Sequence, residues 1–417
     1  MRVIIIGAGL GGLTLAHGLR GAGIEVAVYE RNLRAGPQPA SYGIHINGHG
    51  NRALHACLPA ENWDRYDCGA VPAPDVVRFR APTLATLTAL ELSSLTENAD
   101  PIGHRRAVRR QPLHQALLHG LEDVVEWDKT FSSFTRHVGR RVQVQFADGT
   151  TTEGDLLVGA DGSNSRVRHK YLPALVRHEL GILNVAGRLP LSHPAARALP
   201  RDMTDGSVNN VVPRRAGWLF ASTWPASPRD TAAAAPDEDF LVWAYAAGRR
   251  AYPDDVDSLG PRELQRWVAT RVSDWDPRVT AMISASSPDT IAPVPLRSMT
   301  TLPDWSPSQI TLLGDAIHNM TPMAGIGANT ALRDADALRR SLTGAEPVSL
   351  VERVARYEDE MRAYANEALT LSTRNARNAA SDKRLPRLAF RTLLKVTDSV
   401  APIKRRVFPG AVPTSTA

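Results

Sequence analysis

Three short turns contain the residues of this sequence whose types and spacing could do chemistry. The first is Gly7-Ala8-Gly9-Leu10-Gly11-Gly12, which fits the pattern G-x-G-x-x-G. Glycines at this spacing let a pyrophosphate approach the backbone N–H groups at a helix start, where the helix dipole stabilises negative charge. Glu30 follows about 20 residues later, where a carboxylate can accept hydrogen bonds from ribose hydroxyls. The first turn therefore predicts a dinucleotide site, for FAD or NAD(P).

The second and third turns each place an aspartate directly after an apolar run. Asp161-Gly162 follows Leu156-Leu157-Val158-Gly159, and Gly314-Asp315 follows Thr311-Leu312-Leu313. A carboxylate at the third turn could accept a hydrogen bond from a ribityl hydroxyl. A helix is expected from about Gly327, and its N-terminus could stabilise a ring that becomes anionic on reduction.

The elements that must position these turns alternate between strands and helices. Residues 3–6 form a short β-branched run typical of a buried parallel strand, and residues 13–19 and 24–29 predict a helix and a second strand. Residues 180–296 have a different character: short strand-like runs, with an Ala/Pro-rich loop at 225–238. Another buried strand follows at 310–313, and the pattern is helical from about residue 346. The dinucleotide-binding lobe is thus interrupted and later resumed.

Composition narrows the classes of function. The 417 residues are 43% hydrophobic and 22% charged, which is typical of a globular protein. No apolar stretch approaches the roughly 18 residues of a membrane-spanning helix, so we expect a cytoplasmic protein without membrane association. The two cysteines, Cys57 and Cys68, fit no metal-ligand spacing, and we predict no metal. The net charge is +6, but the arginines are scattered and no nucleic-acid-binding module accompanies them.

In this order, the three turns resemble the motifs of the class A FAD-dependent monooxygenases, the p-hydroxybenzoate hydroxylase-like family. The resemblance covers about residues 1–345. It implies FAD as the cofactor, NADPH or NADH as a transient reductant, and O₂ as co-substrate. The implied reaction hydroxylates an aromatic or polyketide-like small molecule through a flavin C4a-hydroperoxide. The spelling of the third motif is similar to that of members acting on polyketide-like substrates, which points to secondary metabolism.

The implied fold is α/β, with a Rossmann-like FAD-binding domain interrupted by a mostly antiparallel β-sheet substrate domain and followed by C-terminal helices. The FAD-binding domain is predicted at 1–73, 102–175 and 297–345, the substrate domain at 74–101 and 176–296, and the helical region at 346–417.

The resemblance also implies a set of site residues. Arg110 matches the family's arginine on the FAD phosphate, and Pro322 and Gly325 match the loop that lies against the flavin ring. No catalytic base can be assigned. The cofactor-binding residues are predicted to be Gly7, Gly9, Leu10, Gly11, Gly12, Glu30, Arg31, Arg110, Asp161, Asp315, Gly327, Ala328 and Asn329.

Aromatic residues at even spacing on two predicted strands are candidates for the substrate pocket: Trp218, Phe220, Trp243 and Tyr245. Core packing explains the same spacing equally well. His318 is expected to have a structural, hydrogen-bonded role, and His45 and His49 to be loop residues rather than a proton relay.

Other functions remain open at this point. A flavin-dependent halogenase or a reductase could use a related fold, although a W-x-W segment typical of tryptophan halogenases is absent. An NAD(P)-dependent dehydrogenase explains only the first turn. A non-catalytic nucleotide-binding module is the third alternative. The basic segment from Lys383 to Arg406 is expected to form a helix capping the FAD-binding lobe rather than a membrane anchor. The protein could be a monomer or a homodimer.

Overall fold

The computed structural model describes residues 1–34, 43–91, 102–136, 141–224 and 238–399. The chain divides into two compact units, each made of three separate segments. The first unit comprises Met1–Gly69, Arg110–His178 and Arg297–Arg374, and the second Ala70–Arg109, Glu179–Leu296 and Asn375–Ala417. Most of the predicted loop at 225–238, the end of the predicted segment 74–101, and the basic residues 404–406 lie outside the described residues.

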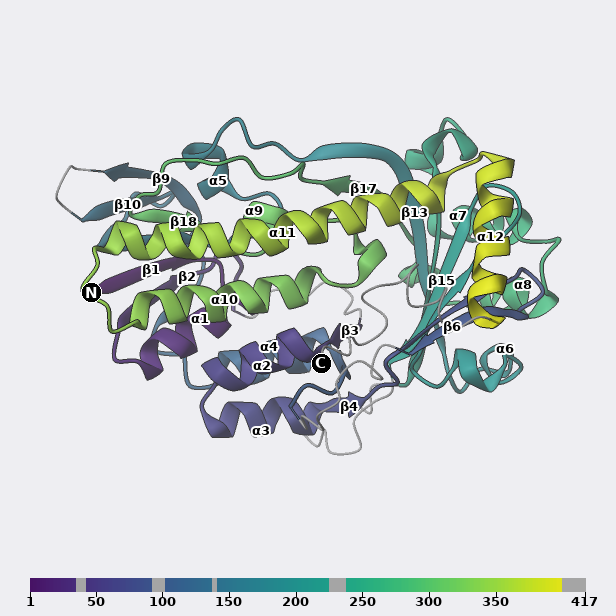
Figure 1. The fold of residues 1–417 in the computed structure, drawn as a ribbon, viewed down its shortest axis with the longest axis horizontal. Helices are drawn as coiled ribbons and strands as arrows, with labels where there is room; N and C mark the ends of the chain where they lie inside the picture. The colour runs from purple at the N-terminus through teal and green to yellow at the C-terminus, as the bar shows by residue number, and fades with distance from the viewer. Residues whose placement is uncertain (35–42, 92–101, 137–140, 225–237, 400–417) are drawn as a thin grey trace. The chain divides into compact units, whose positions relative to one another are not determined.

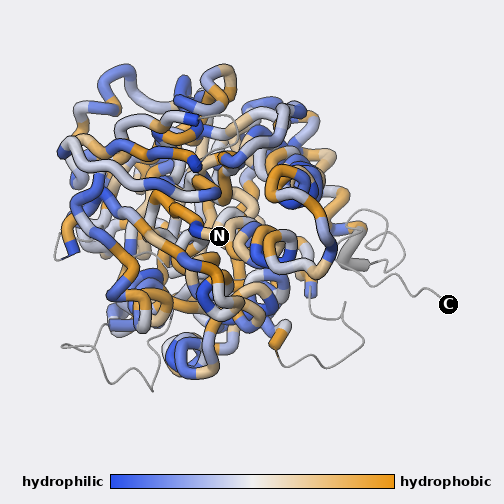
Figure 2. The backbone as a smooth tube through the Cα atoms, turned by 90° about the vertical axis from the view of Figure 1, so that its left-hand side faces the viewer, coloured by the Kyte–Doolittle hydropathy of each residue, from blue (hydrophilic) through white to orange (hydrophobic). Residues whose placement is uncertain are grey.

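The first unit contains a five-stranded sheet in which every pairing is parallel, as the buried apolar runs predict. The strand order is β18-β12-β1-β2-β8. Val3 to Ile6 of β1 are all buried, because a central parallel strand is covered on both faces. Figure 2 shows such hydrophobic segments running inside the hydrophilic ones. The strands are β1 (Arg2–Ile6), β2 (Glu25–Tyr29), β8 (Val125–Glu126), β12 (Leu156–Gly159) and β18 (Ile310–Leu312).

Helices of the first unit pack on this sheet and on one another. Helix α1 (Leu10–Gly21) packs on β1 and β2, and α10 (Gly327–Thr343) packs on α1 (Figure 1). The long helix α11 (Leu350–Ala380) contacts β18, where the Tyr357 hydroxyl donates to the Leu312 carbonyl at 2.9 Å. The remaining elements are β3 (Gly43–Ile46), α2 (Gly48–Cys57), α3 (Ala60–Gly69), α4 (Arg110–Leu118), β9 (Phe131–Arg136), β10 (Val142–Phe146), β11 (Thr151–Gly154), α5 (Arg166–Tyr171), α9 (Asp315–His318) and the 3₁₀ turn η6 (Pro322–Ala324).

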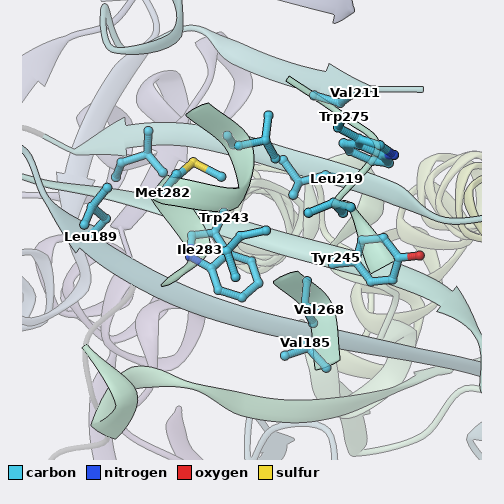
Figure 3. Packing of buried hydrophobic residues seen from close by; sticks show 14 of the residues in the cluster. Val185, Leu189, Val211, Leu219, Trp243, Tyr245, Val268, Trp275, Met282 and Ile283 are labelled. Carbon is cyan, nitrogen blue, oxygen red and sulfur yellow. The ribbon is translucent and has the colours of Figure 1, made fainter. Parts of the chain in front are cut away.

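The second unit is built on a seven-stranded, mostly antiparallel sheet. Its order is β17-β13-β16-β15-β14-β5-β6, and the β14–β5 pair is parallel. Helices α7 and α8 cover one face of the central strands with a buried apolar cluster (Figure 3). The strands are β5 (Val76–Arg80), β6 (Thr86–Glu91), β13 (His178–Pro190), β14 (Val208–Val211), β15 (Trp218–Trp224), β16 (Phe240–Gly248) and β17 (Ala292–Ser298), beside the pair β4 (Ala70–Pro72) and β7 (Arg106–Arg109). The helices are α6 (Pro194–Arg197), α7 (Pro261–Arg271), α8 (Pro277–Ser284) and α12 (Arg384–Ser399), with 3₁₀ turns η2 (Arg201–Met203), η3 (Arg249–Ala251), η4 (Val256–Ser258) and η5 (Pro288–Thr290).

Helix α12 corrects one prediction, because it belongs to the second unit and does not cap the nucleotide-binding lobe. Buried Arg387 donates to the Gly217 carbonyl at 2.7 Å, and buried Arg391 donates to the Val212 carbonyl. Phe390 stacks on Trp218 with ring centroids 6.2 Å apart. These basic residues thus point inward, against the sheet. No helix in the described part of the chain is long and apolar enough to cross a membrane.

The α/β class is confirmed, with a Rossmann-like unit interrupted by a mostly antiparallel sheet and followed by C-terminal helices. The predicted domain limits and the binding roles given to each domain stay predictions.

Candidate cofactor-binding site

The three turns identified in the sequence follow three neighbouring strands. In the sheet, β18, β12 and β1 are adjacent and parallel, with Gly159 paired to both Ile6 and Leu312. Because parallel strands end at the same edge, the turns after Ile6, Gly159 and Leu312 lie side by side there. In open α/β sheets ligands bind at this edge, outside the carboxyl ends of the strands.

The glycines of the first turn are needed for different structural reasons. Gly7 has φ +111°, and a side chain there would overlap the carbonyl oxygen of Ala160 in the second turn. A side chain at Gly12 would overlap the carbonyl oxygen of Gly7. Both are therefore required for the fold itself. At Gly9, by contrast, an added Cβ would have no protein atom within 4 Å, so this glycine leaves free space at the start of α1.

Two helix N-termini of the first unit provide donors for an anionic ligand. Helix α1 begins after Gly9, and α10 begins after Ile326, and neither has a side-chain cap. The first N–H groups of a helix have no partner within the helix, and its dipole favours negative charge. The donors at the start of α1, together with the space at Gly9, fit the phosphate groups of a dinucleotide. Gly327 and Ala328 supply the first two N–H groups of α10.

Asp161, in the second turn, keeps part of its carboxylate unused. Its Oδ2 caps α5 by accepting from the N–H groups of Arg166 (2.7 Å) and Val167 (3.3 Å). Its Oδ1 is buried and has no partner among the described residues. A buried acceptor without a donor is unfavourable, so this atom fits a site that a ligand completes.

Glu30 is buried and holds the first turn from behind. Its Oε2 accepts from the Ala8 N–H and its Oε1 from the Asn32 N–H, each at 2.9 Å. A carboxylate has about four acceptor positions, so two remain for ribose hydroxyls. Arg31 and Arg110 have exposed side chains.

The third turn lies against the first and is anchored from two directions. A Cβ on Gly11 would lie 2.7 Å from Leu313 Cδ1, so the two turns are in close contact. Arg168, which is buried, donates to the Ala316 carbonyl at 2.7 Å. Gly314 has φ +62°, and the next residue, Asp315, is exposed at the start of α9. Asp315 therefore presents its carboxylate outward from a rigidly held turn.

Comparisons with known proteins agree with this arrangement. The FAD binding domain family matches residues 124–372, and the NAD(P)-binding Rossmann-like domain matches residues 5–66. A crystal structure from Photorhabdus luminescens subsp. laumondii TTO1, of a protein assigned as an FAD-containing monooxygenase, is 40% identical with a TM-score of 0.83. The match covers 91% of this chain and 98% of that one. The chain belongs to the class A FAD-dependent monooxygenases. FAD is thereby confirmed as the cofactor.

Two curated relatives in the monooxygenase family differ in length from this chain. The dual O-methyltransferase/FAD-dependent monooxygenase of Cercospora beticola is 27% identical over 92% of this chain, which spans only 47% of that relative. The 3-amino-4-hydroxybenzoate 2-monooxygenase of Streptomyces platensis is 29% identical over 86% of this chain and 83% of its own length. The chain thus spans about half the length of the dual-function relative and most of the other.

The side chain of Asn329, near the start of α10, holds the junction between β3 and α2. The Asn329 Oδ1 accepts from the Asn47 N–H at 2.8 Å, and its Nδ2 donates to the His45 carbonyl at 2.9 Å. Its side chain is thus engaged with the protein, which leaves only its backbone for the predicted contact with FAD. Pro322 begins η6, and Gly325 ends it with φ +65°.

The four aromatic residues predicted for the substrate pocket lie on two different faces of the sheet, and their role at a substrate stays a prediction. Residues paired across antiparallel strands lie on the same face, and Trp243 pairs with Ala221 while Tyr245 pairs with Leu219. Trp218 and Phe220 alternate with Leu219 and Ala221, so they lie on the opposite face.

Trp243 and Tyr245 are core residues beneath α7 and α8 (Figure 3). The Trp243 indole N–H donates to Ser286 Oγ at 2.8 Å. On the other face, Trp218 is buried against Phe390, and Phe220 is only partly buried.

Sequence analysis missed three residues that hold the third turn: Asp334, Tyr364 and Arg168. Asp334 had one usable signal, because it occupies a buried position of amphipathic α10 between Thr330 and Leu338. A charged residue on a buried helix face is unusual unless it is paired. His318, for which we expected a structural role, is fully buried and bonds Asp334 at 2.6 Å. Burial lowers the pKa of His318, but the Asp334 carboxylate, together with the charge of Asp315 and a backbone hydrogen bond, leaves the pKa raised above its ordinary value.

Proposed function

We propose that this chain uses FAD, reduced by NADPH or NADH, to insert one atom of O₂ into an aromatic or polyketide-like small molecule. The observation that carries the proposal is the position of the three turns at one edge of one parallel sheet. The family supports it, because the relatives carry the name FAD-dependent monooxygenase.

The roles of the site residues follow from their positions. The start of α1 at Gly9 to Gly12 would hold the pyrophosphate, and Glu30 the ribose of the adenosine half. Asp315 would bind a ribityl hydroxyl. Arg31 and Arg110 are proposed for the phosphates, and Asp161 for the turn beside them. Leu10, Gly327, Ala328 and Asn329 contribute backbone N–H groups, and Pro322 and Gly325 shape the loop beside the ring.

When bound, the flavin supplies hydride acceptance from the nicotinamide and activation of O₂. The chain's residues bind and orient the cofactor and exclude water. The uncapped N-terminus of α10 would stabilise negative charge on the reduced ring, because fixed N–H groups need no reorganisation. No residue of the described chain is assigned as a proton-transferring base.

The second unit is proposed to hold the substrate. Phe220 is the strongest candidate contact, because it is partly exposed on the sheet face opposite the α7–α8 core. Trp218 lies on the same face beneath α12 and would shape the site rather than touch the substrate. The substrate class rests on relatives, one of which is named for 3-amino-4-hydroxybenzoate. The oligomeric state, monomer or homodimer, and a cytoplasmic location stay predictions.

A direct experiment combines colour with turnover. The purified chain is expected to be yellow with flavin absorption, and phenolic or polyketide-like ligands are expected to stimulate NAD(P)H oxidation together with O₂ uptake. In ¹⁸O₂ the product should gain one labelled oxygen atom. A colourless protein that ignores added FAD would contradict the proposal. Stimulated oxidation without labelled product would favour a reductase, and halide-dependent product formation would favour a halogenase.

A further inference from the structure

One buried carboxylate in the first unit accepts hydrogen bonds from three separate parts of the chain. Asp334 of α10 is fully buried. Its Oδ2 accepts from the Gly314 N–H and from His318 Nε2, each at 2.6 Å. Its Oδ1 accepts from the Tyr364 hydroxyl of α11, also at 2.6 Å. Because a carboxylate can only accept, His318 must carry its proton on Nε2 in this contact.

The two contacts to Oδ2 come from opposite ends of the same short helix. Gly314 is the residue before α9, and His318 is its last residue. A four-residue helix has almost no stability of its own, because helix nucleation costs more than one turn returns. The direction of α9, and of the exposed Asp315 that begins it, therefore depends on what holds its two ends. Asp334 holds both.

The Tyr364 hydroxyl in turn fixes the carboxylate. Without it, Oδ1 would be a buried charged atom lacking a partner, and the carboxylate could rotate about its axis. The Arg333 guanidinium lies 3.8 Å from the centre of the Tyr364 ring and holds that ring in place. The network thus runs from α11 through α10 to the third turn.

We propose that Asp334 and Tyr364 are positioning residues for Asp315, fixing the direction in which its carboxylate meets the ribityl chain of FAD. The inference rests on the proposed role of Asp315 in FAD binding. Neither residue touches the cofactor in this account. They act through the Gly314–His318 turn, and they contribute to FAD affinity only when Asp315 is present.

That dependence gives the test, a double-mutant cycle on FAD affinity in the full-length, FAD-depleted protein. Tyr364→Phe is expected to raise the Kd for FAD about 5- to 10-fold, because it removes one hydrogen bond to a charged group. Asp315→Asn is expected to raise the Kd about 30-fold for its own lost bonds. In the Asp315→Asn background, Tyr364→Phe should change the Kd by less than about twofold, since the neutral amide left at this position makes weaker bonds that depend less on its direction.

A matched control separates this effect from general loss of stability. The Tyr252 hydroxyl is buried in the second unit and lies 3.1 Å from the carbonyl oxygens of Leu183 and Tyr245, which share its one donated proton. Tyr252→Phe removes a buried hydroxyl in the same way and should lower the thermal midpoint without moving the Kd for FAD. Asp334→Asn should weaken FAD binding more than Tyr364→Phe does. If the Asp334→Asn protein does not fold, Tyr364→Phe is sufficient for the test.

Two outcomes would overturn the proposal. One is a Tyr364→Phe protein that binds FAD within about twofold of the wild type. The other is an equal weakening by Tyr364→Phe with and without Asp315, which a purely structural role would produce. Failure of the proposed function is distinguishable, because then the wild type itself would bind no FAD, or Asp315→Asn would have no effect.

Discussion

The two units of this protein differ in how firmly their functional residues are determined by the backbone. In the first unit, the turn after β1 needs glycine at Gly7 and Gly12, because an added side chain would meet the backbone carbonyl oxygens of Ala160 and Gly7. In the second unit, the sequence alone leaves the aromatic residues on β15 and β16 equally suited to the core or to a ligand. A site formed by backbone turns can therefore be predicted from residue types. A site formed by side chains on a sheet can be predicted only once it is known which face of the sheet each side chain lies on.

The largest effect expected separates the two faces of the second unit. Trp243→Ala should lower the free energy of unfolding by about 3–5 kcal/mol, because it opens a large cavity in the core and leaves Ser286 without its indole donor. Urea unfolding of the wild type and of the Trp243→Ala protein measures the difference in the free energy of unfolding. A decrease in the free energy of unfolding below about 1 kcal/mol would show that Trp243 is loosely packed, and it would contradict the difference between the two faces of the sheet.

The next prediction divides the glycines of the first turn into two kinds. Gly9→Val should weaken FAD more than about 100-fold through overlap with the pyrophosphate, while the FAD-free protein keeps its thermal midpoint. Gly12→Val should instead fail to fold, because its side chain meets the Gly7 carbonyl. Thermal unfolding and flavin titration distinguish them. A Gly9→Val protein that is yellow, and so still binds flavin, would show that the first turn is not part of the FAD site.

The buried side chain of Glu358 in α11 is unfavourable for the folded first unit when it is charged, and the pH dependence of stability tests this. Burial raises the pKa of Glu358 from 4.5 to about 7, while Thr311 donates to its Oε1 at 2.8 Å. Between these values the folded protein keeps a proton that the unfolded chain releases, so wild-type stability falls as pH rises from 4.5 to 7. Glu358→Gln keeps an acceptor for Thr311 and removes the titration. At pH 8 this variant should be more stable than the wild type by about 2–3 kcal/mol, with the advantage absent near pH 4.

Equal stabilities of the Glu358→Gln protein and the wild type across this pH range would contradict the burial argument. Such a result would leave the neutral form of the carboxyl no more favourable in the folded protein than in water. Denaturant unfolding at four or five pH values is sufficient.

The smallest effect expected concerns the proposed substrate contact. Phe220→Ala should raise the Kd of a stimulating aromatic ligand about 10-fold and leave flavin content unchanged, because Phe220 is only partly buried where it packs against the cluster of Trp224 and Phe240. Ligand-dependent NAD(P)H oxidation gives the measurement. Loss of flavin and ligand binding together would show that Phe220 acts on the fold.

Much of the first unit could be predicted because its signals are local. The apolar run before Gly7 and the Asp-containing turns each lie within about a dozen residues, and their order indicates the sheet. The face of β16 that carries Trp243 could not be predicted, because period-two spacing gives alternation but not the direction of the core. Asp334 and Tyr364 were missed for a related reason. Their partners lie 20 and 30 residues away, so only the folded chain brings them together.

The central claim is that the turns after β1 and β18 bind opposite halves of one FAD. Titration of FAD and of ADP into the Asp315→Asn and Gly9→Val proteins tests it most directly, because ADP lacks the ribityl chain and the ring. We expect Asp315→Asn to weaken FAD at least about 10-fold with ADP unchanged, and Gly9→Val to weaken both. An Asp315→Asn protein that loses ADP as strongly as FAD, or that loses neither, would contradict the account.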